Sequence, residues 1–146
     1  MNSLALSQEP LRVLIVDDTP DLRDLVAMAL ERTGEFRVVA QAGDGREGLE
    51  AAQTHDPDLV ILDIAMPVMD GLQALPLIRQ ECPSAIVVML SAFGDSSGMP
   101  QRAMAMGADG YLHKDGRIQA LPEQILVIVR AVGSARDARR AREARA

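Results

Sequence analysis

The amino-acid sequence predicts an α/β protein in which five parallel strands form a doubly wound sheet with helices on both faces. Short apolar runs, mostly rich in valine and isoleucine, alternate five times with segments of helical periodicity. Connections of this length force parallel strands and right-handed crossovers. The chain has 146 residues, which is enough for one domain with a substantial core. The five expected strands cover residues 11–16, 36–42, 58–63, 85–90 and 110–114.

Each expected helix follows one of these strands. Thr19 before Pro20 indicates an N-cap followed by the first helical position, which starts the first helix. Asp44 and Glu47, three residues apart, indicate a capping box at the start of the second helix. The apolar residues that place the five helices are Leu22, Leu25, Val26, Ala29 and Leu30; Gly48, Leu49 and Ala52; Leu72, Leu75 and Ile78; the segment 99–106; and the segment 121–132.

The composition excludes several classes of protein. A single cysteine, Cys82, leaves no internal disulfide and no cysteine pair for a zinc site, and it favours a reducing cytoplasm. With no tryptophan, one tyrosine and two phenylalanines, the chain lacks broad aromatic surfaces for stacking on single-stranded nucleic acid. The first ten residues have no basic start and no run of about 18 apolar residues occurs, so we expect neither export nor a membrane span.

Charge divides the chain into an acidic body and a basic tail. Residues 1–129 hold 9 basic and 19 acidic side chains, a net charge of −10, whereas residues 130–146 hold 6 and 2, a net charge of +4. An acidic body argues against non-specific binding of the domain to a phosphate backbone. We expect a disordered N-terminal segment over residues 1–9, a folded domain over residues 10–133, and a basic linker or helical extension over residues 134–146.

Polar side chains end four of the five expected strands. The first strand runs into Asp17 and Asp18, the third into Asp63, the fourth into Ser91 and the fifth into Lys114. In a doubly wound sheet the ligand site lies outside the carboxyl ends of the strands, so we expect these residues to meet. Three crowded carboxylates require a cation, and oxygen-only ligands indicate a hard ion, Mg²⁺ in a cell. Beside such an ion Asp63 could act as a nucleophile toward phosphorus.

Lys114 supports this interpretation because it is the only lysine in a chain with 14 arginines. Its compact, flexible ammonium stands at the strand end where it could contact a phosphoryl oxygen, with the hydroxyl of Ser91 as a hydrogen-bond donor nearby. The sequence therefore predicts that Asp63 accepts a phosphoryl group.

Four stretches together make the sequence resemble the receiver domains of two-component response regulators. They are VLIVDDTP, LVILDIAMPVMDG, VVMLSA and GADGYLHK, and the resemblance covers about residues 10–133. It implies a flavodoxin-like (βα)5 fold with strand order 2-1-3-4-5. It also implies a cytoplasmic signalling protein that accepts a phosphoryl group from a sensor histidine kinase, uses Mg²⁺, and hydrolyses the phosphoaspartate slowly. Such a protein is not an enzyme that turns over a separate substrate.

The resemblance assigns roles to the acidic residues by position. Asp63 matches the phosphoacceptor. Asp18 and Asp63 match the direct Mg²⁺ ligands, together with the backbone carbonyl of Ala65, and Asp17 matches a ligand that binds through a water molecule.

The resemblance also assigns the residues that respond to the phosphoryl group. Ser91 and Lys114 match the hydroxyl and the lysine of the family. Tyr111 matches the aromatic residue that changes rotamer when the hydroxyl moves toward the phosphate. Pro67 and Gly71 match the loop that shapes the site.

One position departs from the family pattern. Many members have a proline after the lysine, often with a cis peptide bond, whereas Asp115 and Gly116 follow Lys114 here, so we expect a trans bond. The form YLHKDG is more similar to the branch with a LuxR-type or NarL-type helix-turn-helix output domain. Because receivers usually regulate an attached output domain, we expect one that is absent from this chain, with a role in transcription, and no specific DNA binding by this segment. Phosphorylation could also produce a homodimer through the fourth helix, fifth strand and fifth helix around Tyr111.

Three alternatives remain open from the sequence. A stand-alone receiver would act only through protein contacts. An aspartyl phosphatase of the haloacid dehalogenase type needs a second acid two residues after its nucleophile, where Ala65 stands. A flavodoxin-like nucleotide binder needs a glycine-rich phosphate loop, and VDDTPD after the first strand contains no glycine. His55 and His113 are interpreted as surface imidazoles rather than sites of phosphorylation.

Overall fold

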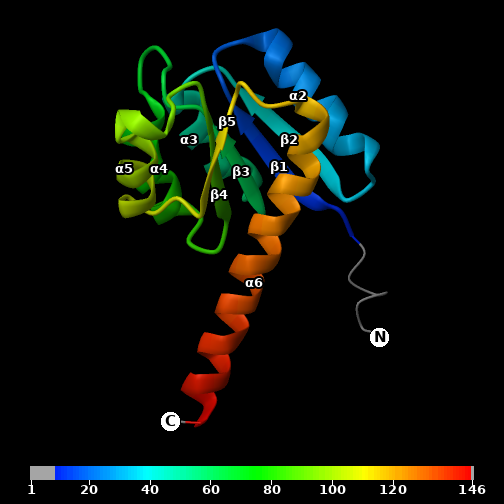
Figure 1. Ribbon diagram of the computed structural model, residues 1–146, viewed down its shortest axis with the longest axis vertical. Coiled ribbons are helices and arrows are strands. Elements are labelled where there is room, and N and C mark those ends of the chain that lie inside the picture. The colour runs from blue at the N-terminus through cyan, green and yellow to red at the C-terminus, as the bar shows by residue number, and fades with distance from the viewer. Residues whose placement is uncertain (1–8, 146) are drawn as a thin grey trace.

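A computed structural model describes residues 9–145 of the chain. Its five strands are parallel and lie in the order β2-β1-β3-β4-β5, which confirms the predicted sheet and strand order (Figure 1). The strands are β1 (Leu11–Val16), β2 (Phe36–Ala42), β3 (Leu59–Leu62), β4 (Ile86–Ser91) and β5 (Gly110–His113).

Helices connect the strands in the predicted alternation. They are α2 (Pro20–Arg32), α3 (Gly45–His55), α4 (Gly71–Glu81), α5 (Met99–Ala105) and α6 (Leu121–Arg145). Two short 3₁₀ turns, η1 (Asp95–Ser97) and η2 (Ile118–Ala120), precede α5 and α6 and have no counterpart among the predicted elements.

The helices cover both faces of the sheet, so the molecule has three layers (Figure 1). Successive residues at the end of β1 show why the central strands are so apolar. Val13 and Ile15 pack with α2 and α6 on one face, whereas Leu14 and Val16 pack with helices α3, α4 and α5 on the other. All four side chains are at most 1% exposed. A strand buried on both faces has no position left for a polar side chain until it reaches the edge of the sheet.

The starts of α2 and α3 lie where the sequence placed them, but their hydrogen bonds differ from the prediction. Thr19 precedes α2, yet its side chain makes no capping hydrogen bond. At α3 the Asp44 carboxylate accepts from the amide of Glu47 at 2.8 Å. The Glu47 carboxylate, however, accepts from the amide of Gly43 at 3.0 Å instead of completing a box with Asp44. A side-chain motif thus located each helix correctly without fixing its hydrogen-bond partners.

A complete capping box occurs at α4, where none was predicted. The Asp70 carboxylate accepts from the amide of Gln73 at 2.8 Å, and the Gln73 side chain accepts from the amide of Asp70 at 3.0 Å. These reciprocal bonds satisfy two amides at the helix start. They fix the start of α4 at the end of the loop that follows β3.

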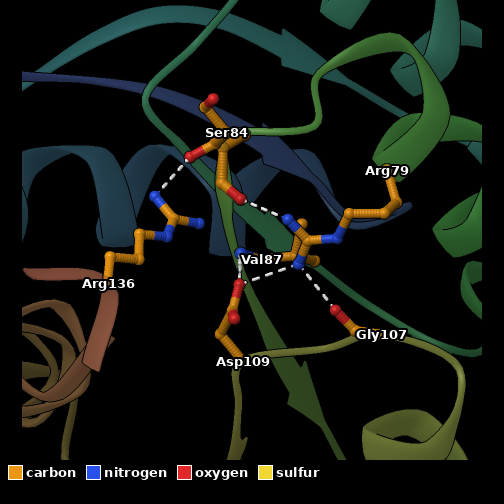
Figure 2. Close-up of polar contacts among 7 residues, drawn as sticks. Arg79, Ser84, Val87, Gly107, Asp109 and Arg136 are labelled. Carbon is orange, nitrogen blue, oxygen red and sulfur yellow. Dashed lines mark hydrogen bonds and ion pairs between the residues drawn. The ribbon is translucent and has the colours of Figure 1, made fainter. Parts of the chain in front are cut away.

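Figure 2 shows how an arginine network closes the amino-terminal edge of the sheet. Arg79 of α4 donates to the carbonyl oxygens of Ala85 and Gly107 and forms an ion pair with Asp109 at 2.8 Å. The same Asp109 oxygen accepts from the amide of Val87 at 2.9 Å. One guanidinium therefore joins α4 to the strand entries of β4 and β5.

The last helix, α6, extends beyond the body of the domain (Figure 1). Leu121 and Ile125 near its start are buried, whereas every side chain from residue 137 to residue 145 is exposed. Arg136 donates to the carbonyl oxygen of Ser84 at 2.8 Å, close to where the helix leaves the body (Figure 2). The helix is continuous across residues 133 and 134, where the predicted domain boundary lies. The predicted N-terminal segment falls almost wholly outside the described residues.

Two further predictions concern single features of the chain. Within residues 9–145, no helix is both long enough and apolar enough to cross a bilayer. No peptide bond in the same range is cis, so the bond between Lys114 and Asp115 is trans, as predicted.

Candidate functional site

The carboxyl edge of the sheet brings the predicted polar residues together. Asp17 directly follows β1, Asp63 directly follows β3, Ser91 ends β4, and Lys114 directly follows β5. Asp17, Asp63 and Ser91 are at most 4% exposed, and they are the buried polar side chains of the described residues. Because neighbouring parallel strands end at the same edge, residues up to 97 positions apart in the sequence become neighbours here.

Lys114 forms ion pairs with two of the carboxylates. Its Nζ lies 2.8 Å from Oδ2 of Asp17 and 3.0 Å from Oδ2 of Asp63. Its backbone amide donates to the carbonyl oxygen of Ser91 at 2.9 Å, which anchors the start of the Lys114 side chain beside β4. The only ammonium side chain in the sequence therefore lies between the two buried acids.

The backbone holds the other oxygen of each buried carboxylate. Oδ1 of Asp17 accepts from the amide of Thr19 at 2.9 Å, and Oδ1 of Asp63 accepts from the amide of Ile64 at 2.8 Å. In each acid, Oδ1 is thus used in orientation, and Oδ2 faces Lys114. Thr19 thus contributes its backbone amide to the site, although its side chain does not cap α2.

Burial and charge act in opposite directions on the acid and the lysine. Burial is the largest influence on Asp63 and raises its pKa, with a further rise from the charge of Asp17, while hydrogen bonds from Lys114 and Ile64 oppose the rise. Burial alone would lower the pKa of Lys114, but its hydrogen bonds to Asp17 and Asp63 outweigh this, so the pKa is raised overall. In the pair of Asp63 and Lys114, each charged group therefore offsets part of the cost of burying the other.

Asp18 adds a third carboxylate to this group. One oxygen from each of Asp17, Asp18 and Asp63 lies within 4.8 Å of the other two, with Asp18 exposed. Carboxylate oxygens grouped in this way, two buried and one open to solvent, are the donor set that a hard divalent cation requires. The residues therefore fit Mg²⁺, and the exposed side chain leaves a side open for water ligands.

The loop between β3 and α4 is packed tightly against Asp63. Gly71 donates its amide to the carbonyl oxygen of Ile64 at 2.8 Å, and a Cβ at position 71 would overlap the carbonyl oxygen of Asp63. Val68 has a φ of 67°, a left-handed conformation that a β-branched residue rarely adopts. The loop that contains Pro67 and Ala65 is thus held close to the acid by a position that only glycine can occupy.

Ser91 and Tyr111 both hydrogen-bond to the backbone of Phe93, in the loop that follows β4. The Oγ of Ser91 accepts from the amide of Phe93 at 3.1 Å, and the hydroxyl of Tyr111 donates to the carbonyl oxygen of Phe93 at 2.8 Å. Phe93 therefore connects the serine and the tyrosine through its own peptide groups. The sequence contained no signal for this connection, because it is made by backbone atoms of an irregular segment.

Comparisons with known proteins agree with this geometry. The profile of the response regulator receiver domain family matches residues 13–126. The protein-glutamate methylesterase/protein-glutamine glutaminase of Azospirillum brasilense is 37% identical over 144 residues, which are 94% of this chain and 36% of that protein. The nitrate/nitrite response regulator protein NarL of Escherichia coli K12 is 38% identical over 109 residues, 75% of this chain and 50% of that protein. The chain thus spans half or less of the length of these two curated relatives.

Solved structures give the same match. The signal receiver domain of the response regulator NarL from Mycobacterium tuberculosis has a TM-score of 0.75 and 35% identity, covering 81% of this chain and 94% of that one. The response regulator domain of CheB from Thermotoga maritima has a TM-score of 0.76 and 29% identity, covering 85% of this chain and 97% of that one. Both matches cover nearly the whole of the solved domain.

Proposed function

The chain belongs to the response regulator receiver domain family, and on that premise we propose that it accepts a phosphoryl group from a sensor histidine kinase on Asp63. The observation that carries the proposal is the position of Oδ2 of Asp63. This oxygen is free of backbone hydrogen bonds among the described residues and lies 3.0 Å from Nζ of Lys114. A nucleophilic oxygen beside a fixed ammonium is the arrangement that phosphoryl acceptance needs.

In the proposed reaction, Oδ2 of Asp63 attacks phosphorus. An oxygen–phosphorus bond forms as the phosphorus–nitrogen bond to the kinase histidine breaks, and the released imidazole takes a proton from solvent. A phosphoryl group on Oδ2 would lie next to Nζ of Lys114, which would then pair with a phosphoryl oxygen. Hydrolysis of the phosphoaspartate by water would return the carboxylate. No separate substrate is turned over, so we do not propose an enzyme in the ordinary sense.

We propose that Asp17, Asp18, Asp63 and the carbonyl oxygen of Ala65 hold Mg²⁺, Asp17 through a water molecule. Bound Mg²⁺ would supply positive charge that offsets the negative charge of the transferring group. The backbone bonds to Oδ1 of Asp17 and of Asp63 keep both carboxylates oriented before any ligand arrives. Such preorganisation lowers the cost of assembling the site.

The response to phosphorylation is proposed to pass through Ser91 and Tyr111. The Ser91 hydroxyl would move toward the phosphoryl group. Tyr111 would then change rotamer, because both side chains are hydrogen-bonded to the backbone of Phe93. The surface formed by α5, β5 and α6 would then be read by an output domain or by a second copy of the chain. The relatives include a nitrate/nitrite response regulator and a methylesterase. Between these we favour a transcriptional output, because the sequence YLHKDG is more similar to the NarL branch. We propose that the chain acts in the cytoplasm.

The experiment that tests this function is phosphorylation by acetyl phosphate, measured by intact mass. We expect one added phosphoryl group with Mg²⁺ present and none with EDTA. Asp63→Asn should abolish the addition, whereas Asp24→Asn, which removes an exposed carboxylate of α2, should leave it unchanged. Equal phosphorylation of the Asp63→Asn variant would show that the acceptor lies elsewhere.

A phosphatase and a stand-alone receiver remain the competing functions. Ala65 occupies the position where an aspartyl phosphatase needs its second acid, so we expect no turnover of p-nitrophenyl phosphate beyond the slow hydrolysis of the phosphoaspartate. Sustained turnover would favour the phosphatase. A receiver that acts alone would bind its partner protein without any added output domain, which a pull-down with phosphorylated chain would detect.

A further inference from the structure

Three contacts join the end of β4 and the loop that follows it to β5 and to Lys114 directly after β5. The Lys114 amide donates to the carbonyl oxygen of Ser91 at 2.9 Å, and the Tyr111 hydroxyl donates to that of Phe93 at 2.8 Å. The third contact joins Nε2 of His113 to Oδ1 of Asp95 at 3.1 Å. The first two involve residues already placed in the site and its switch. The third involves two residues with no role so far.

His113 is well placed to influence the switch because of its position in β5. In the parallel pairing of β4 and β5, His113 is the register partner of Ser91. His113 and Tyr111 are two residues apart, so they lie on the same face of the strand. Their rings meet edge to face, with centroids 5.5 Å apart and planes at 64°. The imidazole thus contacts the switch tyrosine on one side and η1 on the other.

The same loop must move if Ser91 is to turn toward a phosphoryl group. In this structure the Ser91 oxygen accepts from the Phe93 amide, and the Phe93 carbonyl accepts from Tyr111. Asp95 lies only two residues further along. An attachment at Asp95 therefore restrains the segment that carries both of these bonds.

We propose that His113 and Asp95 form a tether that stabilises the resting position of the loop after β4 and so sets how readily Ser91 and Tyr111 switch. This rests on the proposed function, since it concerns regulation of the same site. His113 is a positioning residue here, because it acts on the loop and not on the phosphoryl group. A tether raises the free energy of the switched state relative to the resting state, so removing it should favour the switched state.

The expected effect is modest, because the Asp95 side chain is 87% exposed and that of His113 is 37% exposed. Exposed pairs are screened by water and salt, so removing the tether should change a switching equilibrium by about twofold to fivefold. The contact does not require a charged imidazole. Nε2 can donate to a carboxylate both in the imidazolium and in the neutral tautomer that carries its proton on Nε2.

The experiment uses the full chain and four variants: Asp95→Ala, Asp95→Asn, His113→Ala and the Asp95→Ala/His113→Ala double variant. Ser96→Ala is the control, because it truncates an exposed neighbour in the same 3₁₀ turn. In the unliganded protein, amide hydrogen exchange at residues 93–95 should be about twofold to fivefold faster in Asp95→Ala than in wild type or Ser96→Ala. Asp95→Asn keeps an acceptor oxygen and should lie between them.

Coupling to the switch is measured by titrating beryllofluoride with Mg²⁺ and following tyrosine fluorescence. Tyr111 is the only tyrosine and the chain has no tryptophan, so this signal reports on the switch residue alone. Asp95→Ala should bind beryllofluoride about twofold to fivefold more tightly than wild type, and the double variant no more tightly than the tighter single variant. Matching exchange rates in Asp95→Ala and Ser96→Ala, or additive effects in the double variant, would overturn the tether.

Together with intact mass, the two measurements separate failure of the tether from failure of the proposed function. If wild type gains no phosphoryl group by intact mass, the proposed function fails and the regulatory role fails with it, whatever the exchange rates. If wild type is phosphorylated but gives no Tyr111 response to beryllofluoride, only the proposed response through Ser91 and Tyr111 fails, and the tether fails with it. If wild type responds and Asp95→Ala exchanges faster but binds beryllofluoride with unchanged affinity, the contact exists without controlling the switch. That result also contradicts the proposal.

Discussion

At the scale of single residues, the site depends on how each buried carboxylate divides its two oxygens. Asp17 and Asp63 each direct Oδ1 to a backbone amide and Oδ2 to Lys114. The backbone hydrogen bonds fix the orientation of both carboxylates, so Oδ2 is the oxygen of each acid that remains for a phosphoryl group, a metal ion or Lys114. The Lys114 ammonium lies between the two Oδ2 atoms, so the shape of this side chain matters as much as its charge.

Lys114→Arg tests the shape. The guanidinium keeps the charge but replaces a compact ammonium with a broad planar group that cannot occupy the same position between Asp17 and Asp63. We expect phosphoprotein yields within about twofold of wild type, because the acid and the metal ligands remain, but loss of more than about half of the Tyr111 fluorescence response. A variant that matches wild type in both yield and response would show that Lys114 does not couple the phosphoryl group to β5.

Cys82 provides a test of the core at the same scale. The side chain is 3% exposed, and its thiol lies 3.5 Å from the carbonyl oxygen of Ala52. Burial, with smaller contributions from Asp56 and Glu81, raises the pKa of this thiol. Because only the thiolate reacts, iodoacetamide at pH 8 should modify the native protein at least about 100-fold more slowly than the urea-unfolded chain. Comparable modification rates in the native and unfolded protein would mean that Cys82, at the carboxyl end of α4, is open to solvent.

At the scale of elements, two residues that both look like helix N-caps in the sequence make different hydrogen bonds. Asp70 makes a reciprocal capping box with Gln73, whereas Thr19 gives its amide to Asp17 and makes no side-chain cap. Both residues precede a helix and both are common N-caps. Only the three-dimensional structure distinguishes them.

A matched pair of substitutions measures this difference. Asp70→Ala removes the acceptor of the Gln73 amide and should lower the free energy of unfolding by about 1 kcal/mol. Thr19→Ala removes no capping bond and should cost less than about 0.5 kcal/mol. Urea unfolding monitored by circular dichroism gives both values under one set of conditions. A Thr19→Ala variant as destabilised as Asp70→Ala would contradict the assignment of the caps.

The elements also show which parts of the structure could be predicted from the sequence. The predicted ranges 11–16 and 36–42 match β1 and β2 to the residue. In β1 the run from Val13 to Val16 is buried on both faces and is followed at once by Asp17 and Asp18, so the end of the strand is sharply marked in the sequence. The site residues were found by the same logic, since strand ends meet at one edge whatever the loops do. The contacts of Phe93 and the pair of His113 with Asp95 could not be found, because they depend on the path of an irregular loop. Backbone partners leave no side-chain pattern.

At the scale of the whole molecule, charge and shape separate the body from the end of α6. The body up to residue 129 carries 9 basic and 19 acidic side chains, and the projecting end carries five arginines between residues 136 and 145. This end has only alanine as an apolar residue after residue 132, so it offers no hydrophobic seam for a coiled coil. It lacks aromatic and amide side chains for contacts with bases as well.

This distribution predicts weak binding of residues 1–146 to DNA. Fluorescence anisotropy with two duplexes of equal length and different sequence should show equal affinity at low salt and loss of binding at physiological salt. Arg140→Ala/Arg142→Ala should weaken the low-salt binding for both duplexes alike. Tight, sequence-selective binding that survives physiological salt would show that the chain contains its own output module.

The central claim is that Asp63 is the residue that accepts the phosphoryl group, and the most direct measurement locates the modification itself. Protein treated with acetyl phosphate and Mg²⁺ is reduced with borohydride, which converts a phosphoaspartate to homoserine, and is then sequenced by tandem mass spectrometry. We predict homoserine at position 63 alone, and none when EDTA replaces Mg²⁺. Homoserine at position 17 or 18, or a phosphoryl group found instead on His55 or His113, would contradict the account.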